Sequence, residues 1–559
     1  MLAKTIEHVI KVNIKGKDYL YQFQNAWDPV KQRSYSKHRI TLGRLIDGKV
    51  ELGRKFLRNN PQYKDVELTF TDNKLCPVGI AEVSLPVAQI VLNRSEALNA
   101  GASYVLEQIA KQSGITKALK VVFPEHWKEL LSLAIFLVIH PDATVSNYDV
   151  IAQNSLYPTA AIPSQRISEI FESIDYQPSV EQYLKLRLAS NKALDKNSYW
   201  AFDTTSVSSF SQTIHKVAYG HNKEDPDMAM LKLALLIDEK TAEPLYYKVL
   251  DGSIADVVLL KNLFIQLAKL DAEDVNLVLD RGFCSEHNLQ IMFRNHVVGF
   301  VCGLRSELKI VEQTFKEVAG SLRLCLPAAF KNSVNCFCAT REIQWYSNTR
   351  KYGAEQDKLF IHIYYSKERE ADYVMNMTQL VESFKLRLKN GKVPNSPYFR
   401  QFFKRGKDDD GKVKYDFNVP AWAQFCQSCG FFFLGSDRIS LPDEALNIYR
   451  QKDTVEKAFN NYKDRCGGRR LRCLERALDG KVFVTYLALS LRLMLHKRMQ
   501  DANIDPEQAP RLISELNALT VYKFAPEGQV TYLWHEIPKR YKELMQKLKI
   551  KIPAPIFVI

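Results

Sequence analysis

The chain has 559 residues, of which 46% are hydrophobic and 25% are charged, and these proportions are typical of soluble globular proteins. They exclude a disordered, collagen-like or coiled-coil chain, and the length predicts three to five domains because single cores stop growing at about 250–300 residues. Lys and Arg number 77 against 63 Asp and Glu, a formal net charge of +14 that favours a polyanionic partner.

The sequence predicts no membrane segment. The longest apolar run, residues 130–139, is shorter than the roughly 18 residues of a membrane helix and predicts a buried helix instead. The N-terminal residues lack the apolar stretch of a signal peptide. We therefore expect a cytoplasmic protein with no membrane partner, in which most of the ten cysteines are free thiols.

Residues 1–80 are expected to form a β-rich, basic N-terminal module. Alternating residues over 36–45 predict a strand, and Asp47-Gly48 predicts a turn. Residues 31–58 contain nine Lys or Arg and two acids. This basic hairpin is either a solvated surface or a module that contacts phosphates.

Residues 81–195 are expected to form a helical domain. Helices over 104–112 and 115–122, separated by Gly114, resemble a helix-turn-helix unit, and a further helix is predicted over 164–174 after Pro163. Polar side chains at the start of this last helix suit a DNA-reading surface. The same pattern is common in ordinary helical bundles, so both interpretations stay open.

Residues 196–305 alternate between strand and helix patterns and are expected to form the first part of a catalytic core. The order of three strands followed by helix, strand, helix and strand predicts a mixed sheet covered by helices. The strands are expected at 199–202, 228–237, 245–250, 275–279 and 297–304, with helices over 255–270 and 285–295.

Two acids, Asp203 and Asp280, each follow an apolar strand of this predicted sheet. A single acid at such a position is more often a turn or cap residue, but the pair lies on strands of one sheet. Because adjacent strands are about 4.8 Å apart, the two carboxylates are expected to share divalent metal ions. Their hard oxygen ligands suit Mg²⁺ or Mn²⁺.

The later part of the chain changes character several times. Residues 306–420 are expected to form a β-rich insertion domain, with strands at 334–343 and 359–365 and a helix near 369–389. Residues 421–500 are expected to complete the core, and 501–559 to form a helical tail with an amphipathic segment over 532–548. Cys426 and Cys429 lack the spacing of a known zinc module, so no zinc site is expected.

A helix is predicted over 441–463, and four of its side chains share one face. At about 100° per residue, Tyr449, Lys452, Glu456 and Lys463 fall within about 60° of one another. An acid beside a phenol and two cations could complete a metal site and hold phosphate. The alternative is an ordinary exposed face with Glu–Lys pairs.

The order Asp203, Asp280 and Glu456 resembles that of the DDE transposases of bacterial insertion sequences. The helix resembles the Y-(2)-R-(3)-E-(6)-K signature of the branch that excises its element through DNA hairpins. Here it reads Tyr449-(2)-Lys452-(3)-Glu456-(6)-Lys463, and Lys452 keeps the charge of Arg but loses its bidentate fork. The segments RSYSKHRITLGRL, SQRISEI, FDTTSVSSFS, YYKVLDGSIADVVLLKN and LDRGF resemble the same proteins, so the resemblance covers about residues 15–500.

The resemblance implies a multidomain α/β protein whose RNase H-like mixed-sheet core is interrupted by the β-rich insertion and accompanied by a helical DNA-binding domain. It implies that Asp203, Asp280 and Glu456 are the catalytic residues and hold two Mg²⁺ ions, with Mn²⁺ as a substitute. Its implied activity is metal-dependent DNA cleavage and strand transfer in a bacterial, nucleoid-associated setting. The implied partners are the double-stranded DNA of transposon ends and target and, in a synaptic complex, a second copy of the chain. No nucleotide cofactor is expected, because no Gly-Lys-Ser/Thr phosphate loop is present.

The resemblance also suggests which residues contact DNA, although alternatives remain. Arg281 is equally an exposed structural residue, and Trp345, a candidate wedge against a flipped base, is also a candidate core residue of the insertion. The basic run 385–407 is expected to follow a DNA backbone. A nuclease without strand transfer and a DNA-binding descendant of a transposase stay open as functions. The full set of expected DNA contacts is Tyr449, Lys452, Lys463, Arg281, Trp345, Lys385, Arg387, Lys389, Arg400, Lys404 and Arg405.

Overall fold

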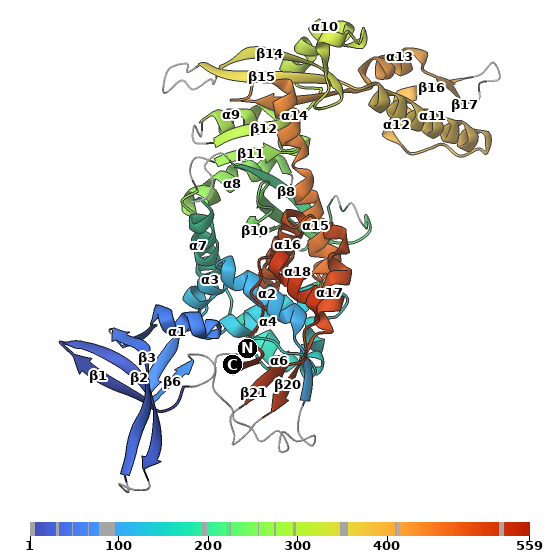
Figure 1. The fold of residues 1–559 in the computed structure, drawn as a ribbon. Coiled ribbons are helices and arrows are strands. Elements are labelled where there is room, and N and C mark those ends of the chain that lie inside the picture. The colour runs from blue at the N-terminus through green and yellow to red at the C-terminus, as the bar shows by residue number, and fades with distance from the viewer. Residues whose placement is uncertain are drawn as a thin grey trace.

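The structure is a computed structural model (Figure 1). It describes residues 6–558 apart from 29–32, 47, 65, 78–95, 193–197, 221, 223–224, 255, 273–274, 295–297, 347–355, 408–410, 412 and 525–529. Within these ranges, no helix combines the length and the apolar character that a membrane crossing requires.

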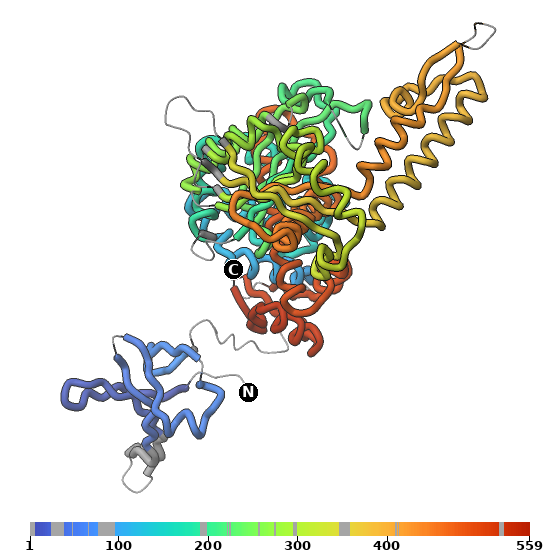
Figure 2. The backbone as a smooth tube through the Cα atoms, turned by 90° about the horizontal axis from the view of Figure 1, so that it is seen from above, coloured from blue at the N-terminus to red at the C-terminus, as the bar shows by residue number. Residues whose placement is uncertain are grey.

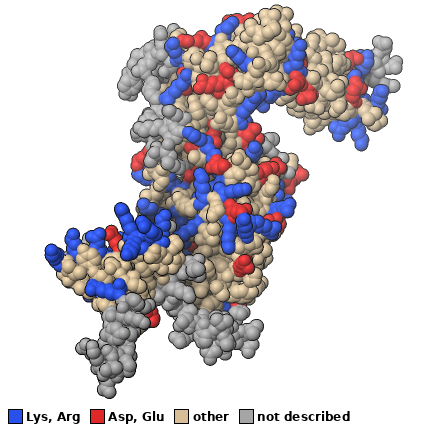
Figure 3. All heavy atoms as spheres, in the orientation of Figure 1, with Lys and Arg blue, Asp and Glu red and all other residues tan. Residues whose placement is uncertain are grey.

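The N-terminal module is a small β unit set apart from the rest of the chain (Figure 2). Its four-stranded antiparallel sheet packs on a core that contains Val9, Leu20, Leu42 and Phe56. The strand expected at 36–45 lies within β3, and Asp47 of the expected turn lies outside the described residues. Figure 3 shows Lys and Arg side chains gathered on one face of the module. The elements are β1 (Val9–Ile14), β2 (Lys17–Asp28), β3 (Arg33–Ile46), β4 (Lys49–Leu52), α1 (Arg54–Asn59), β5 (Leu68–Thr71) and β6 (Lys74–Pro77).

The helical region forms around α4 (Trp127–Ile139), a helix that is apolar nearly all round and in which residues 130–138 are all buried. It packs against α2 and against α16 (Leu478–Asp501), which comes from the far end of the chain. Gly114 separates α2 from α3 with a φ of +82°, a backbone conformation that favours glycine. The expected helices are present as α2 (Gly101–Gln112), α3 (Ile115–Val122) and α6 (Ser164–Glu172), accompanied by α5 (Tyr148–Ala152) and α7 (Glu181–Lys192).

One large mixed sheet runs through the middle of the chain, as the sequence predicts. Its strand order is β10-β9-β8-β11-β12-β18-β15-β14-β13, and β8, β11 and β12 are parallel neighbours. Helices α8 (Asp256–Lys269), α9 (Glu286–Arg294) and α10 (Lys309–Arg323) accompany the sheet. The strands are β8 (Tyr199–Ser209), β9 (Met230–Asp238), β10 (Pro244–Leu250), β11 (Val275–Leu279), β12 (Val298–Leu304), β13 (Phe330–Lys331), β14 (Cys336–Tyr346), β15 (Gln356–Tyr365) and β18 (Phe431–Ser436), with β19 (Arg470–Leu471) beside β8.

Strand β8 is longer than the sequence analysis predicts. The prediction ends this strand at Phe202, but the strand continues to Ser209 because its pairing with β9 extends to Ser208 opposite Met230. The Thr and Ser residues of this stretch are polar, so the sequence pattern did not predict that the strand continues. Asp203 therefore lies within a strand and not after its end.

The region expected to be a β-rich insertion is divided between two structures. Strands β13, β14 and β15 extend the large sheet, because β15 pairs with β18. Residues 367–428, which include the rest of the expected insertion and extend past its expected end at 420, are mostly helical. They pack on a small aromatic core of their own and project from the body (Figure 2). We call residues 367–428 the arm. It contains α11 (Lys367–Lys389), α12 (Pro397–Phe402), β16 (Phe403–Lys407), β17 (Val413–Phe417) and α13 (Val419–Ser428).

The C-terminal residues are not purely helical, which corrects the expected helical tail. The predicted amphipathic segment 532–548 begins as strand β21 and becomes helical only after Pro538, the residue that precedes α18. Strand β20 pairs with β7, so the end of the chain closes a small sheet with residues far upstream. The elements are α17 (Ala509–Asn517), β20 (Thr520–Phe524), β21 (Thr531–Trp534), α18 (Lys539–Lys547), β22 (Ile556–Phe557) and β7 (Glu96–Asn99).

Candidate active site

The register of two parallel strands brings Asp203 and Asp280 together. Leu279, the last residue of β11, pairs with Phe202 in β8. An aspartate follows each of these two residues, Asp203 within β8 and Asp280 directly after β11, so the two aspartates come next to each other at the end of the paired stretch. Residues in register on adjacent strands point to the same face, and the strands are about 4.8 Å apart. The two carboxylates therefore share one face of the sheet.

The third acid, Glu456, comes from a helical segment that crosses beside these strands. The single helix expected over 441–463 consists of α14 (Pro442–Arg450) and α15 (Asp453–Arg465). Between them Lys452 keeps helical backbone angles, and the Val455 N–H donates to the Lys452 carbonyl over three residues at 2.9 Å. This local tightening leaves Tyr449, Lys452 and Glu456 on one side of the segment.

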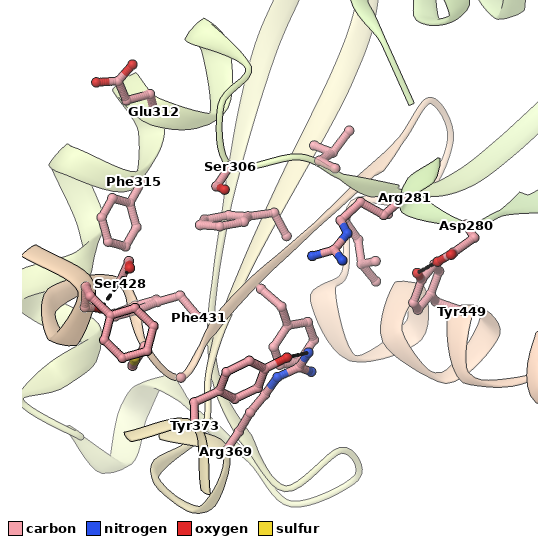
Figure 4. A pocket seen from close by; sticks show the side chains of 18 of the residues that line it. Asp280, Arg281, Ser306, Glu312, Phe315, Arg369, Tyr373, Ser428, Phe431 and Tyr449 are labelled. Carbon is pink, nitrogen blue, oxygen red and sulfur yellow. Dashed lines mark hydrogen bonds between the residues drawn. The ribbon is translucent and has the colours of Figure 1, made fainter. Parts of the chain in front are cut away.

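Contacts among these side chains define the site. The Tyr449 hydroxyl donates to Oδ1 of Asp280 at 2.9 Å, and Figure 4 shows the two side chains pointing toward each other. The Lys452 ammonium donates to the same oxygen at 3.0 Å and to Oε1 of Glu456 at 3.4 Å. One cation therefore joins two acids that are far apart in the sequence.

A glycine makes room for the tyrosine. A Cβ at Gly303 in β12 would lie 2.8 Å from the Tyr449 hydroxyl and 3.0 Å from the backbone nitrogen of Arg281. The first separation is shorter than Cβ atoms show in proteins, and the second is tighter than most Cβ contacts. The absence of a side chain at this position thus allows Tyr449 to reach Asp280.

The electrostatics of the site hold its groups in charged or donor forms. Burial by itself raises the pKa of Asp280, but the Lys452 ammonium, the Arg281 backbone and the Tyr449 hydroxyl together lower it below its usual value. Burial lowers the pKa of Lys452, yet Asp280, Glu456 and Asp203 raise it overall. Burial and the Asp280 charge raise the pKa of Tyr449. At neutral pH the site therefore contains the Asp280 carboxylate, the Lys452 ammonium and the protonated Tyr449 phenol.

The donor chemistry of the site fits a divalent metal ion. Carboxylate oxygens are the ligands that Mg²⁺ and Mn²⁺ prefer, and the side chains of Asp280 and Glu456 are 41% and 56% exposed. In the described part of the chain, no group of three or more His, Cys, Asp or Glu side chains is arranged so that it could hold a metal ion, and the three acids are no exception. Asp203 accepts a hydrogen bond from the Thr204 N–H, and Lys452 supplies the positive charge between the other two acids.

The remaining expected DNA contacts near the core are found in different environments. Arg281 is exposed in the short 3₁₀ helix that follows Asp280. Lys463 is only 8% exposed, in the last turn of α15. Trp345 is 8% exposed and stacks on Phe293 of α9 with ring centroids 6.1 Å apart. Trp345 therefore packs against a helix of the core.

The expected contacts of the basic run all belong to the arm. Five of the six side chains are exposed, and Lys385 is half-buried because it pairs with Glu382 at 2.7 Å and lies over the Phe417 ring. Figure 3 shows Lys and Arg side chains on the underside of the arm. Lys385, Arg387 and Lys389 lie on α11, Arg400 on α12, and Lys404 and Arg405 on β16.

A cavity of about 500 Å³ extends from Asp280 to the base of the arm (Figure 4). Asp280, Arg281 and Lys452 line one end. At the other end the Arg369 guanidinium lies 4.8 Å from the ring centroid of Phe432 and 5.5 Å from that of Tyr373. The sequence analysis singled out none of these three residues.

Comparisons with known proteins were made for the whole chain. Residues 198–489, a little over half of the chain, match the family described as "Transposase DDE domain". Among solved structures, a piggyBac transposase synaptic complex with hairpin DNA overlaps 74% of this chain and 70% of its own, at 11% sequence identity and a TM-score of 0.32. No curated protein sequence matches the chain.

Proposed function

This chain belongs to the family of transposases with a DDE domain, and we propose on that premise that it is a DNA transposase that moves an insertion sequence. It binds the terminal inverted repeats, excises the element by metal-dependent phosphoryl transfer and joins the ends to target DNA. The observation that supports this proposal is the contact of Lys452 with both Asp280 and Glu456, with Asp203 on the strand next to the one that Asp280 follows.

Asp203, Asp280 and Glu456 would hold the divalent ions. When bound, such ions activate a water or a 3′-hydroxyl and stabilise the charge on the leaving oxygen. Asp280 is well suited to this role because its pKa is lowered, which keeps it ionised and ready to bind a cation at neutral pH. The phosphate to be cleaved lies at the end of the cavity that Asp280, Arg281 and Lys452 line.

The protein's cations orient the substrate in this proposal. Arg281 and Lys452 contact phosphates next to the cleaved bond, and Tyr449 holds Asp280 in position through its hydroxyl. The basic run of the arm contacts the backbone farther away. Since each active site processes one DNA end, two copies of the chain pair the two ends in a synaptic complex.

Excision through DNA hairpins is the finer part of the proposal. Hairpin formation bends DNA sharply and requires space for an unstacked base. The aromatic end of the cavity, with Tyr373, Phe432 and the stacked Arg369, offers such a surface. Trp345 remains the other candidate, and its burial against Phe293 favours a packing role.

One gel assay tests the proposed function. The protein is incubated with Mg²⁺, a target plasmid and labelled DNA ends taken from the sequences that flank its gene. Insertion into the plasmid supports the transposase, cleavage alone indicates a nuclease, and a mobility shift alone indicates a DNA-binding descendant. Asp203→Asn, Asp280→Asn and Glu456→Gln should each abolish cleavage and leave the shift. Cleavage by any of the three would overturn the assignment of the site.

A further inference from the structure

Lys452 occupies the space between two of the proposed metal ligands. Its ammonium lies 3.0 Å from Oδ1 of Asp280 and 3.4 Å from Oε1 of Glu456. The Lys452 side chain is 19% exposed, whereas those of Asp280 and Glu456 are 41% and 56% exposed. The cation thus lies deeper in the site than the ends of the acids that it joins.

The hydrogen bonds to Oδ1 of Asp280 leave this oxygen little capacity for a metal ion. Oδ1 accepts from both the Tyr449 hydroxyl and the Lys452 ammonium. A carboxylate oxygen has two lone pairs, and a bound Mg²⁺ ion requires one of them at about 2.0–2.1 Å. A divalent ion at this oxygen therefore competes with Lys452 for the same electrons, and its charge repels the ammonium.

The cavity provides an alternative partner for the lysine. Lys452 and Arg281 line its Asp280 end, where the proposed function places a DNA phosphate. A lysine carries a compact charge on a flexible four-carbon stem, so it can exchange one anion for another by rotating its side chain. A guanidinium at this position would be bulkier and more tightly fixed by its fork of donors.

We propose that Lys452 is a built-in competitor of the catalytic metal ions. Without DNA, its ammonium neutralises Asp280 and Glu456 and keeps the affinity for divalent ions low. When a DNA end enters the cavity, the ammonium moves to a phosphate and frees both carboxylates. Metal loading is thereby coupled to the presence of substrate, which protects other DNA from cleavage. This inference rests on the proposed function, because it requires the three acids to be metal ligands.

The test measures Mn²⁺ binding to the full chain by electron paramagnetic resonance of the free ion, first without DNA. The variant Lys452→Met lacks the partly buried ammonium that pairs with the acids. It should therefore bind Mn²⁺ about five- to tenfold more tightly than the wild type. Lys452→Arg keeps the charge and should not show this gain. Lys457→Met removes an exposed lysine of α15, the helix that begins directly after Lys452, and serves as the matched control. A duplex carrying the element's end should then tighten Mn²⁺ binding to the wild type more than to Lys452→Met.

The outcomes separate the inference from the proposed function. Equal Mn²⁺ affinity of Lys452→Met and wild type, with Asp280→Asn and Glu456→Gln weakened, would overturn the competition and leave the metal site intact. If Asp280→Asn and Glu456→Gln bind Mn²⁺ as the wild type does, the metal site itself is misplaced and the proposed function fails. A circular dichroism melt of each variant verifies that it is folded, and Lys452→Gln replaces Lys452→Met if the latter is not.

Discussion

The Tyr449 hydroxyl donates a 2.9 Å hydrogen bond to Oδ1 of Asp280, although the two residues are 169 positions apart in the chain. The bond joins the end of strand β11, which Asp280 follows, to helix α14, which precedes the helix α15 that contains Glu456. It depends on Gly303, whose missing side chain leaves space for the phenol. Tyr449 is therefore a positioning residue for Asp280 as well as an expected phosphate contact.

Tyr449→Phe tests that positioning role. The variant loses only the hydroxyl, and a hydrogen bond to a charged group contributes about 1.5–3 kcal/mol. We expect cleavage to slow by about tenfold or more while the affinity for DNA ends stays within about twofold of the wild type. Single-turnover cleavage and mobility shifts measure the two quantities. Tyr522→Phe in the C-terminal sheet is the matched control, and an equal loss of DNA affinity and rate would assign Tyr449 to substrate binding instead.

A buried ion pair fastens the helical region to the large sheet. Arg187 of α7 is paired with Glu243 beside β10 and also donates to the Ser113 carbonyl, and both charged side chains are almost fully buried. Removing one partner leaves an uncompensated buried charge, so Arg187→Met or Glu243→Gln should destabilise the protein by about 3–5 kcal/mol. The double variant Arg187→Met/Glu243→Leu should be milder. Urea unfolding measures the differences.

An exposed pair provides the comparison for this experiment. Lys316 and Glu312 form an ion pair on α10 whose side chains are 70% and 55% exposed. Lys316→Met should change stability by no more than about 0.5 kcal/mol, because exposed pairs are screened by solvent. A double variant at Arg187 and Glu243 that is less stable than both single variants would contradict the argument.

Local signals in the sequence were sufficient to predict the elements nearest the site. The apolar run at 275–279 matches β11 residue for residue, and the helical spacing of Tyr449, Lys452 and Glu456 placed these three side chains on one face. Both signals are set by short-range periodicity. Strand order was not predictable in this way, because the pairing of β15 with β18 depends on contacts between distant segments.

Other features of the site depend on contacts that no short pattern encodes. The extension of β8 past Asp203 follows from its pairing with β9, and one end of the cavity is lined by Arg369 at the base of the arm and Phe432 of β18, which are far apart in the sequence. The contact between Lys452 and Asp280 likewise requires the segment between α14 and α15 to lie beside the end of β11. Spacing along a helix identifies a shared face but not what that face meets.

His362 in the centre of the large sheet makes stability depend on pH. It is fully buried between Thr340, Ser436 and the Ile439 carbonyl, and burial lowers its pKa to about 4. The unfolded chain binds a proton near pH 6.5 and the folded chain does not, so stability falls as the pH drops from about 6.5 toward 4.

At pH 5 the loss from His362 is about 2 kcal/mol relative to pH 7.5. His362→Gln cannot take up this proton, so its thermal midpoint should fall less than that of the wild type between pH 7.5 and pH 5. His287→Gln, which changes an exposed histidine of α9, is the control. Equal falls in the wild type and His362→Gln would show that the histidine is protonated in both states or in neither.

Substitutions of Trp345 test whether this residue packs the core or acts in hairpin formation. Its ring is stacked on Phe293 and almost fully buried, so Trp345→Ala should destabilise the protein by about 3–5 kcal/mol. Trp345→Phe should retain most of the stability that Trp345→Ala loses. On pre-nicked ends, at a temperature where the variants are folded, we expect hairpin yields equal to that of the wild type. A specific loss of hairpins by folded Trp345→Ala would restore this residue as the wedge.

The basic side chains of the arm should determine how strongly salt weakens DNA binding. Each phosphate contact releases counterions and contributes about 0.9 to the slope of log affinity against log salt concentration. Replacing the exposed cations Lys389, Arg400, Lys404 and Arg405 with Gln should therefore reduce that slope by about three to four, if all four contact phosphates.

The measurement is a series of binding titrations between about 50 and 200 mM salt. A charge-matched variant with Lys316, Lys497, Lys539 and Lys547 changed to Gln controls for the loss of net charge, because these side chains lie outside the arm. If both variants reduce the slope equally, only the overall charge matters. An unchanged slope in the arm variant would place the DNA elsewhere, whereas a reduction confined to it assigns the backbone contact to α11, α12 and β16.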